Sequence, residues 1–363
     1  MTTLLVTGGA GFIGANFVRS WRSAHAHDAI VVLDALTYAG NRASLDSIPD
    51  IHFVHGDIRN YDLVYQLLSA RSIDTIVHFA AESHVDRSIS GPDIFIDTNV
   101  SGTHSLLKAA KAAWLETGTG RPHRFHHVST DEVFGSLEPG EPPFRETTPY
   151  APTSPYAASK AASDHLVRAY HHTYGLQTTI SNCSNNYGPY QFPEKLIPLF
   201  LLNALAGKNL PIYGDGKNVR DWLHVEDHCR GIERILIRGK PGETYNIGVN
   251  SELTNLQVVD HICQELDAIF AANAGLCSNF PRCPAARGDP TRSLSTFVLD
   301  RPGHDRRYAI DATKIRQELD FAPRYRFAEG LASTLSWYLT HQDWWRPLAT
   351  PGPSPATASR TGG

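Results

Sequence analysis

Short apolar runs alternate with helical patterns along the first half of the chain. Runs of this length, rich in β-branched residues and bounded by turn residues, are typical of buried strands. We predict strands over Thr3–Thr7, Ile30–Leu33, His52–His55, Thr75–Ala80 and Arg124–Ser129. We predict helices over Phe12–Ala24, near Ile94–Leu115 and from Ser154-Pro155 onward, where serine can cap a helix whose first position suits proline. The repeated strand–helix–strand units indicate an α/β fold, a doubly wound parallel sheet of the Rossmann type.

The pattern changes near residue 186. A strand near Thr178–Ser181 precedes this point, and irregular sequence rich in proline, glycine and aromatic residues follows it. We therefore divide the chain into a Rossmann domain at 1–185 and a smaller C-terminal α/β lobe at 186–349, which would bind substrate and return some segments to the first domain. The stretch Ala271–Ser295, rich in Pro, Cys and Arg, predicts a loop, and the low-complexity residues 350–363 predict a disordered tail.

Composition and charge argue against several classes of function. The 363 residues are 41% hydrophobic and 19% charged, with a net charge of −4, which suits a globular protein but lacks the basic field that duplex nucleic acid requires. No run of 18 apolar residues occurs, so we expect no membrane span. The five cysteines form no CxxC pair, which favours the reducing cytoplasm. The pattern His224-Val-Glu-Asp-His228 has the order HxExH rather than the HExxH of zinc sites, so we expect no metal.

A glycine-rich turn follows the first predicted strand. Gly9-Ala10-Gly11-Phe12-Ile13-Gly14 opens a helix, and glycines there allow a pyrophosphate to approach the helix N-terminus closely. Asp34 ends the second strand, 20 residues beyond Gly14, and an acid at that position accepts hydrogen bonds from a ribose diol but repels a 2′-phosphate. The pattern favours NAD over NADP, and the alternative is an ordinary glycine-rich turn. Asp57, after the next strand, would either meet the adenine or serve as a plain turn residue.

Tyr156 and Lys160 form a YxxxK pair, and their spacing places both side chains on one face of a helix. For tyrosine to act as a base near pH 7, its pKa has to fall by roughly three units, or about 4 kcal/mol. A lysine about 5 Å away supplies roughly 3 kcal/mol at an effective dielectric constant of about 20. We therefore expect Lys160 to do most of this lowering. The alternative is an exposed helical pair, which YxxxK often is by chance.

Two adjacent carboxylates follow the fifth predicted strand. Ser129-Thr130-Asp131-Glu132 lies at its carboxyl end, the edge at which open α/β sheets bind ligands. In different environments, one carboxyl group can be held protonated as an acid while the other stays ionised as a base. Taken alone, the same segment could be a polar strand exit with a helix cap.

Seven motifs occur in a recognisable order. They are GGAGFIG, HFAAESHVDRSI, STDEVFG, YAASK, NNYGPYQFPEKLIP, RDWLHVEDH and DRPGHDRRY. With them the chain resembles the dTDP-glucose 4,6-dehydratases, a family of extended short-chain dehydrogenases/reductases that act on nucleotide sugars. The resemblance covers residues 1–347. The first motif and YxxxK mark only the superfamily, whereas the Thr-Asp-Glu exit, NNYGPYQFPEKL and DRPGHDRR are far more specific.

The resemblance implies a lyase reaction with no net redox change. Tyr156 would take the proton of the sugar C4 hydroxyl as a hydride passes to NAD, and Thr130 would hydrogen-bond that oxygen. Glu132 would then remove the C5 proton, and protonated Asp131 would protonate the departing C6 hydroxyl. Return of the hydride to C6 would give dTDP-4-keto-6-deoxyglucose. The alternatives are a 4,6-dehydratase or epimerase of another nucleotide sugar such as UDP-glucose, and a non-catalytic NAD-binding member of the fold.

The resemblance also implies the binding residues and the assembly. The cofactor would be bound by Gly8, Gly11, Phe12, Ile13, Gly14, Asp34, Asp57, Ile58, Ala80, Ala81, Ser83, Thr98, Tyr156, Lys160 and Asn186. The substrate would be bound by Ser83, Thr130, Asn185, Lys195, Leu196, Pro211, Tyr213, Arg220, Asn255, Arg301 and His304. Arg220 and Arg301 are the expected diphosphate clamps, because guanidinium grips phosphate with two hydrogen bonds; for Pro211 and Asn255 the alternative is packing of the lobe. Related enzymes are usually homodimers joined by a four-helix bundle, here the helices Ile94–Leu115 and Tyr156–Tyr174.

Overall fold

The computed structural model describes residues 2–117, 120, 122–300 and 303–349. The predicted phosphate ligand Arg301 and the predicted disordered tail at 350–363 lie outside the described residues. Within the described ranges, no helix is long and apolar enough to cross a membrane.

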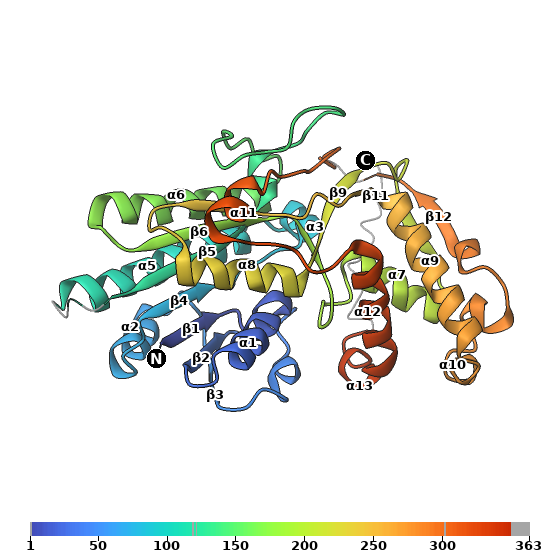
Figure 1. Ribbon diagram of the computed structural model, residues 1–363, viewed down its shortest axis with the longest axis horizontal. Helices are drawn as coiled ribbons and strands as arrows, with labels where there is room; N and C mark the ends of the chain where they lie inside the picture. Colours follow the sequence, from blue (N-terminus) through green and yellow to red (C-terminus); the bar gives the residue numbers. More distant parts are fainter. Residues whose placement is uncertain (1, 118–119, 121, 301–302, 350–363) are drawn as a thin grey trace, which may run out of the picture.

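A seven-stranded parallel sheet forms the centre of the larger part of the molecule (Figure 1). Its order is β10-β6-β5-β4-β1-β2-β3, and neighbouring strands pair in parallel throughout. The strands are β1 (Thr3–Thr7), β2 (Ala29–Asp34), β3 (Ile51–His55), β4 (Thr75–His78), β5 (Arg124–Thr130), β6 (Thr178–Cys183) and β10 (Thr244–Ile247). The strand order reverses between β1 and β4, and ligands bind at such a switch point in open α/β sheets. The predicted doubly wound sheet is confirmed.

Helices cover both faces of this sheet. One face carries α1 (Phe12–Ala24), α8 (Val225–Arg238) and α11 (Thr313–Leu319), which pack into one apolar core with the strands. The other face carries α2 (Tyr61–Ala70), α5 (Thr103–Lys111) and α6 (Pro155–Tyr174), which form a second core. Helix α6 begins as the sequence predicts, since the Ser154 side chain accepts a hydrogen bond from the Ala157 amide.

The predicted helix near Ile94–Leu115 is a run of unequal segments. It consists of α4 (Asp93–Phe95), a π-helical turn at Ile96–Gly102, α5, and a second π-helical turn at Ala112–Glu116. A shorter helix, α3 (Val85–Ser90), precedes it. The first wide turn places Asn99 against α6, where its backbone carbonyl accepts a hydrogen bond from Ser163 at 2.6 Å. Wide turns of this kind are frequent beside functional sites.

A smaller lobe lies beside the sheet (Figure 1). Its helices are α7 (Leu196–Leu205), α9 (Asn255–Ala272), α10 (Gly275–Asn279), α12 (Phe327–Thr340) and α13 (Gln342–Trp345). Its strands form two small sheets, β11 (Glu252–Thr254), β9 (Val219–His224) and β7 (Asn185–Tyr187) in one, and β12 (Ser295–Val298) with β8 (Leu210–Tyr213) in the other. The chain also leaves this lobe to add β10 and α8 to the larger part. The division at residue 185 stays a prediction.

The segment predicted as a loop at Ala271–Ser295 is more ordered than expected. After α10, it contains the 3₁₀ turns Pro284–Arg287 and Thr291–Leu294. Phe280 and Cys283 are buried in the core of the smaller lobe, and Thr291 donates to Asp267 of α9 at 2.5 Å. Single apolar residues among prolines follow neither a helical nor a strand period. The sequence pattern therefore did not predict that this segment packs on the smaller lobe.

Candidate active site

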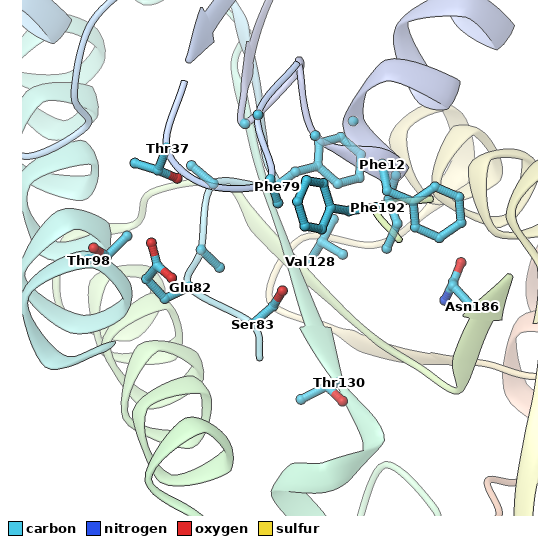
Figure 2. Close-up of a pocket in the computed structure, with 18 of the residues that line it drawn as sticks. Phe12, Thr37, Phe79, Glu82, Ser83, Thr98, Val128, Thr130, Asn186 and Phe192 are labelled. Carbon is cyan, nitrogen blue, oxygen red and sulfur yellow. The ribbon is translucent and has the colours of Figure 1, made fainter. Parts of the chain in front are cut away.

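A cavity of about 380 Å³ opens at the carboxyl ends of the central strands. Most of the residues predicted from the sequence line it together. They are Gly8, Gly11, Phe12, Ile13, Gly14, Asp34, Asp57, Ile58, Ala80, Ala81, Ser83, Thr98, Thr130, Asp131, Glu132, Tyr156, Lys160, Asn185, Asn186, Lys195 and Leu196. Figure 2 shows Thr130 at the end of β5, with Ser83 on one side and Asn186 on the other.

The glycine turn forms a cradle whose backbone segments pack too closely for side chains at two of its positions. A Cβ on Gly14 would lie 2.2 Å from the Gly8 carbonyl oxygen, and one on Gly8 would lie 2.5 Å from the Ala80 amide nitrogen. Gly11 differs, because a Cβ there would meet only the Gly8 oxygen at 3.2 Å. Gly11 lines the cavity and is the N-cap of α1 without any side-chain hydrogen bond to the free amides. The protein's own packing therefore constrains Gly11 less than Gly8 or Gly14, and close approach of a phosphate is a further reason for glycine there.

Asp34 anchors the loops beside this cradle. Its carboxylate accepts hydrogen bonds from the amides of Ala10 and Leu36, each at 2.8 Å. Burial nevertheless raises the pKa of Asp34 above its usual value. Each carboxylate oxygen retains a second lone pair, so Asp34 can also receive a ribose hydroxyl. These features fit the adenosine half of a dinucleotide. Asp57 also lines the cavity, and its carboxylate receives two hydrogen bonds from the Arg59 guanidinium.

The two carboxylates after β5 have distinct surroundings. They begin a 3₁₀ turn, Asp131–Phe134, in which Asp131 is 2% exposed. Burial, reinforced by the charges of Glu132 and Asp221, raises the pKa of Asp131 well above its usual value. Thr130 Oγ1 donates to Asp131 Oδ1 at 3.4 Å and accepts the Glu132 amide at 3.3 Å. Asp131 is therefore suited to hold a proton as an acid.

Tyr156 and Lys160 both line the cavity, as expected for two residues on one face of α6. Lys160 Nζ donates to the Val128 carbonyl at 2.8 Å and lies 3.4 Å from His127 Nε2. Burial, and then the charge of Glu132, raise the pKa of Tyr156 well above its usual value. Lys160 is not among the main causes of this shift, so its lowering of the Tyr156 pKa stays a prediction.

Behind Lys160 lies a second buried carboxylate, Asp164. Its Oδ1 lies 3.2 Å from His127 Nε2, and its Oδ2 accepts hydrogen bonds from Tyr150 at 2.7 Å and Ser129 at 2.9 Å. Burial lowers the pKa of Lys160 to about 8, and the charge of Asp164 opposes this shift. The sequence interpretation missed Asp164, although it follows Lys160 by four residues on the same helix face.

The remaining predicted substrate residues lie in the smaller lobe beside the cavity rather than on its wall. They are Pro211, Tyr213, Arg220, Asn255 and His304. Arg220 donates to the Asp305 carbonyl at 2.9 Å, and its guanidinium lies 4.2 Å from the centre of the Tyr308 ring. The charge of Arg220 acts on Asp131 and lowers its pKa in part. Their part in binding the nucleotide stays a prediction.

Three segments close over the cavity through residues that the sequence interpretation did not single out. The Arg87 guanidinium lies 3.8 Å from the centre of the Tyr38 ring and 3.3 Å from Glu194 Oε2. Tyr38 also meets the Phe192 ring edge-on at 5.8 Å. Tyr38, Phe192 and Glu194 all line the cavity. Phe192 and Glu194 lie within the motif NNYGPYQFPEKLIP. This motif indicated the family resemblance, but the sequence interpretation gave neither residue a role.

No group of three or more His, Cys, Asp or Glu side chains among the described residues is placed to hold a metal ion. The two histidines of the HxExH pattern have other contacts. His224 packs against the Tyr325 ring, with the ring centres 4.0 Å apart. His228 Nδ1 lies 2.9 Å from Asn186 Oδ1.

Comparison with known proteins gives the family. The model of the family described as GDP-mannose 4,6 dehydratase matches residues 5–334. A dTDP-glucose 4,6-dehydratase of Xanthomonas campestris pv. campestris strain B100 is 56% identical over 350 residues, covering 95% of both chains. The chain belongs to the dTDP-glucose 4,6-dehydratase family. Another member, dTDP-glucose 4,6-dehydratase 1 of Escherichia coli K12, is 50% identical over 354 residues and is matched over 94% of both chains.

Solved structures of this dehydratase family have the same fold. The dTDP-glucose 4,6-dehydratase from Streptomyces venezuelae, determined with NAD bound, aligns with a TM-score of 0.84 at 49% identity. That alignment covers 96% of this chain and 100% of the other. A Thermotoga maritima UDP-glucose 4-epimerase aligns with a TM-score of 0.78 at 25% identity, covering 93% and 98% of the two chains. The dehydratases are therefore much closer in sequence than the epimerase, although both share the fold.

Proposed function

We propose that this protein converts dTDP-glucose to dTDP-4-keto-6-deoxyglucose and water. One observation carries the proposal: a buried acid with a raised pKa, Asp131, lies beside Glu132 and Tyr156 in the cavity that also contains the glycine cradle. Elimination of water needs an acid for the leaving hydroxyl and a base for the neighbouring carbon. Family membership at 50–56% identity to dTDP-glucose 4,6-dehydratases supports the same reaction.

The cofactor of this reaction is NAD, and the chain presents the groups to hold it. Gly8 and Gly14 allow the tight packing of the turn at the start of α1, Gly11 leaves room beside it for the pyrophosphate, and Asp34 is available to the ribose. When bound, NAD supplies the redox chemistry, taking a hydride from C4 of the sugar and returning it at C6, and its positive ring favours the phenolate of Tyr156. Solved relatives with bound NAD support this choice of cofactor.

The side chains of this protein move the protons. Tyr156 takes the proton from the C4 hydroxyl, and Thr130 hydrogen-bonds the same oxygen. The ketone at C4 makes the C5 proton acidic, and Glu132 removes it. Asp131 then gives its proton to the C6 hydroxyl, which leaves as water. The contacts of Tyr38, Arg87 and Glu194 at the cavity would limit the access of solvent to these steps.

The nucleotide half of the substrate would extend toward the smaller lobe. Arg220 would bind the diphosphate, and Tyr213 and Lys195 would help to hold the nucleotide. Lys195 Nζ donates to the Ser83 carbonyl at 3.1 Å, so this side chain already connects the lobe with the loop after β4.

We also propose a cytoplasmic homodimer. Ile89 on α3 and Ile96 in the first π-helical turn are 44% and 48% exposed, and Ile96 lies within the segment Ile94–Leu115 expected in a four-helix bundle. An exposed apolar group of this kind is typical of an interface. All five cysteines are free thiols, which suits a reducing compartment. Light scattering on the purified protein would give twice the chain mass for the dimer, and the single-chain mass would contradict it.

The reaction is tested by incubating the purified holoenzyme with dTDP-glucose, UDP-glucose and CDP-glucose. The expected product is a 4-keto sugar, seen by its alkaline absorbance, with the mass of one water lost. Product from dTDP-glucose alone, without added NAD, would support both the reaction and the base preference. An isomer of unchanged mass would favour an epimerase. Bound NAD without any product would favour a non-catalytic protein.

A further inference from the structure

This inference rests on the proposed function. At the end of that reaction, one proton is on a different side chain from the one that held it at the start. Tyr156 gains the proton of the C4 hydroxyl and finds no place to return it, because the product keeps its ketone at C4. Asp131 loses a proton to the departing water. Glu132 takes the C5 proton and gives it back at C5, so it ends unchanged. Each cycle therefore ends with one proton too many on Tyr156 and one too few on Asp131.

A single hydroxyl group joins these two residues. Thr130, at the end of β5 (Figure 2), lies beside Tyr156, whose pKa a hydrogen bond with the Thr130 hydroxyl group lowers. The same hydroxyl group donates from Oγ1 to Asp131 Oδ1 at 3.4 Å. The Glu132 amide donates to the same Oγ1 at 3.3 Å and holds the hydroxyl group in place. A hydroxyl group that accepts from one side and donates to the other can pass a proton along that line.

The two oxygens of Asp131 have different surroundings. Oδ1 receives the Thr130 hydroxyl, whereas the buried Oδ2 has no hydrogen-bond partner among the described residues. Asp131 lines the cavity, so Oδ2 remains for the C6 hydroxyl of the sugar. A half-turn about the Cβ–Cγ bond exchanges the two oxygens, which lets a proton arrive on one side and leave on the other.

Other exits for the Tyr156 proton are less suitable. The Lys160 ammonium donates to the Val128 carbonyl, and the Cys183 thiol donates to the Ser129 carbonyl at 3.4 Å. Both groups act as hydrogen-bond donors in these contacts, so neither is placed to accept the proton of Tyr156. Tyr156 and Thr130 are 9% and 8% exposed, so bulk water has little access to either hydroxyl.

We propose that Thr130 carries the proton from Tyr156 to Asp131 and so resets the site after each turnover. The Tyr156 O–H bond breaks as an O–H bond forms on Thr130 Oγ1. The original Thr130 O–H bond breaks as one forms on Asp131 Oδ1. No electrons are transferred, no co-reactant is needed, and the phenolate and the carboxylic acid are restored together.

Rapid mixing of the holoenzyme with excess dTDP-glucose tests the relay, with Thr130→Val compared to Thr130→Ser. Valine keeps the shape of threonine but has no hydroxyl, so its first turnover should exceed its later turnovers by at least about tenfold, a burst of one product per site. Serine retains the hydroxyl and should restore the wild-type ratio of first to later rates. The absorbance of co-purified NAD checks that each variant is folded and loaded.

The outcomes separate this proposal from the proposed function. Equal slowing of the first and later turnovers in Thr130→Val would overturn the relay, because a hydroxyl that only orients the sugar or lowers the pKa of Tyr156 acts in every cycle. A burst that persists in Thr130→Ser would overturn it as well. Absence of product with the wild-type enzyme would instead overturn the proposed function.

Discussion

Asp131 and Asp164 are two buried carboxyl groups that flank the same strand, and their environments shift their pKa values in opposite directions. Asp131 follows β5, is 2% exposed, and has one weak hydrogen bond and two neighbouring acids. Asp164 is fully buried on α6, yet His127, Lys160 and Tyr150 outweigh burial and hold its pKa below the usual value. Burial alone therefore does not decide the charge of a carboxyl group; its partners decide it.

The opposite pKa shifts indicate different roles for Asp131 and Asp164. Asp164 stays ionised, and its charge opposes the lowering of the Lys160 pKa by burial. The neighbouring His127 has its own pKa lowered to about 4 by burial and by the charge of Lys160. Asp131 is buried where an ionised carboxylate would be poorly solvated, so it keeps its proton. Holding this proton lowers the free energy of unfolding at neutral pH. Near the same strand, β5, Asp164 therefore stabilises the fold, whereas Asp131 provides a reactive acid at the expense of stability.

The largest expected effect comes from Asp131→Asn, which removes the transferable proton and keeps the shape. We expect the dehydration rate to fall by about 100- to 10,000-fold, the usual range for loss of a general acid. The free energy of unfolding at pH 7 should rise, because an amide does not have to be kept protonated. Product assays and urea denaturation measure both changes. Glu132→Gln is the control, since it should stop deuterium exchange at C5, whereas Asp131→Asn should not.

Asp164→Asn should have the opposite effect on stability. Removing one partner of a buried charge cluster typically costs about 3–5 kcal/mol, and urea denaturation should show a loss of that size. The folded-state pKa of Asp164 is lowered, so its contribution is present at pH 7 and is lost as the pH falls through that pKa. The gap between wild type and variant should therefore narrow in acid. An equal loss at every pH would contradict the ionic role.

Tyr150→Phe tests one contact of the anchor while leaving its charge in place. The Tyr150 hydroxyl donates to Asp164 Oδ2 and accepts from Arg168, both at 2.7 Å. Losing such a hydrogen bond to a charged group typically costs about 1.5–3 kcal/mol, less than the loss in Asp164→Asn. Urea denaturation of the two single variants and the double variant measures the coupling. Additive losses would show that Tyr150 does not act through Asp164.

The smallest effect is a shift in the pH profile of Asp221→Asn. The charge of Asp221 helps to raise the pKa of Asp131, so its removal should lower that pKa. Because Asp131 works as an acid only when it is protonated, the loss of activity at alkaline pH would begin at a lower pH in Asp221→Asn than in the wild type. Asp215→Asn is the matched control, because Asp215 is paired with Arg306 at 3.0 Å on the surface. The same shift in both variants would contradict a local effect of Asp221.

The sequence was most informative where function depends on residues close together in the chain. The bounds of β1 and α1 agree with the predicted Thr3–Thr7 and Phe12–Ala24, since a strand, a glycine turn and a helix follow one another directly. The cavity brings together Thr130, Asp131, Glu132 and Tyr156 as the strand end and the helix pattern indicated.

Contacts between distant segments were not predictable from local pattern. The sequence pairs Lys160 with Tyr156, one helical turn away, but it does not show that packing of α6 on β5 also brings the Lys160 ammonium group to Val128 and His127. Likewise, Arg87, Tyr38 and Glu194 come from three segments, and nothing in their local sequence shows that they meet. Such positions are set by tertiary packing rather than by helix or strand propensity.

Strand β10 has a consequence for the order in which the chain folds. Residues 244–247 pair with β6, and α8, which precedes them, packs on α1 near the other end of the chain. As the chain leaves the ribosome, β6 remains an open sheet edge until residue 247 has emerged, and the smaller lobe begins to form in between. Open edges invite pairing with other chains. The sheet is therefore completed only after the smaller lobe has begun to form, so the nascent protein has an aggregation-sensitive interval that lasts until residue 247 has emerged.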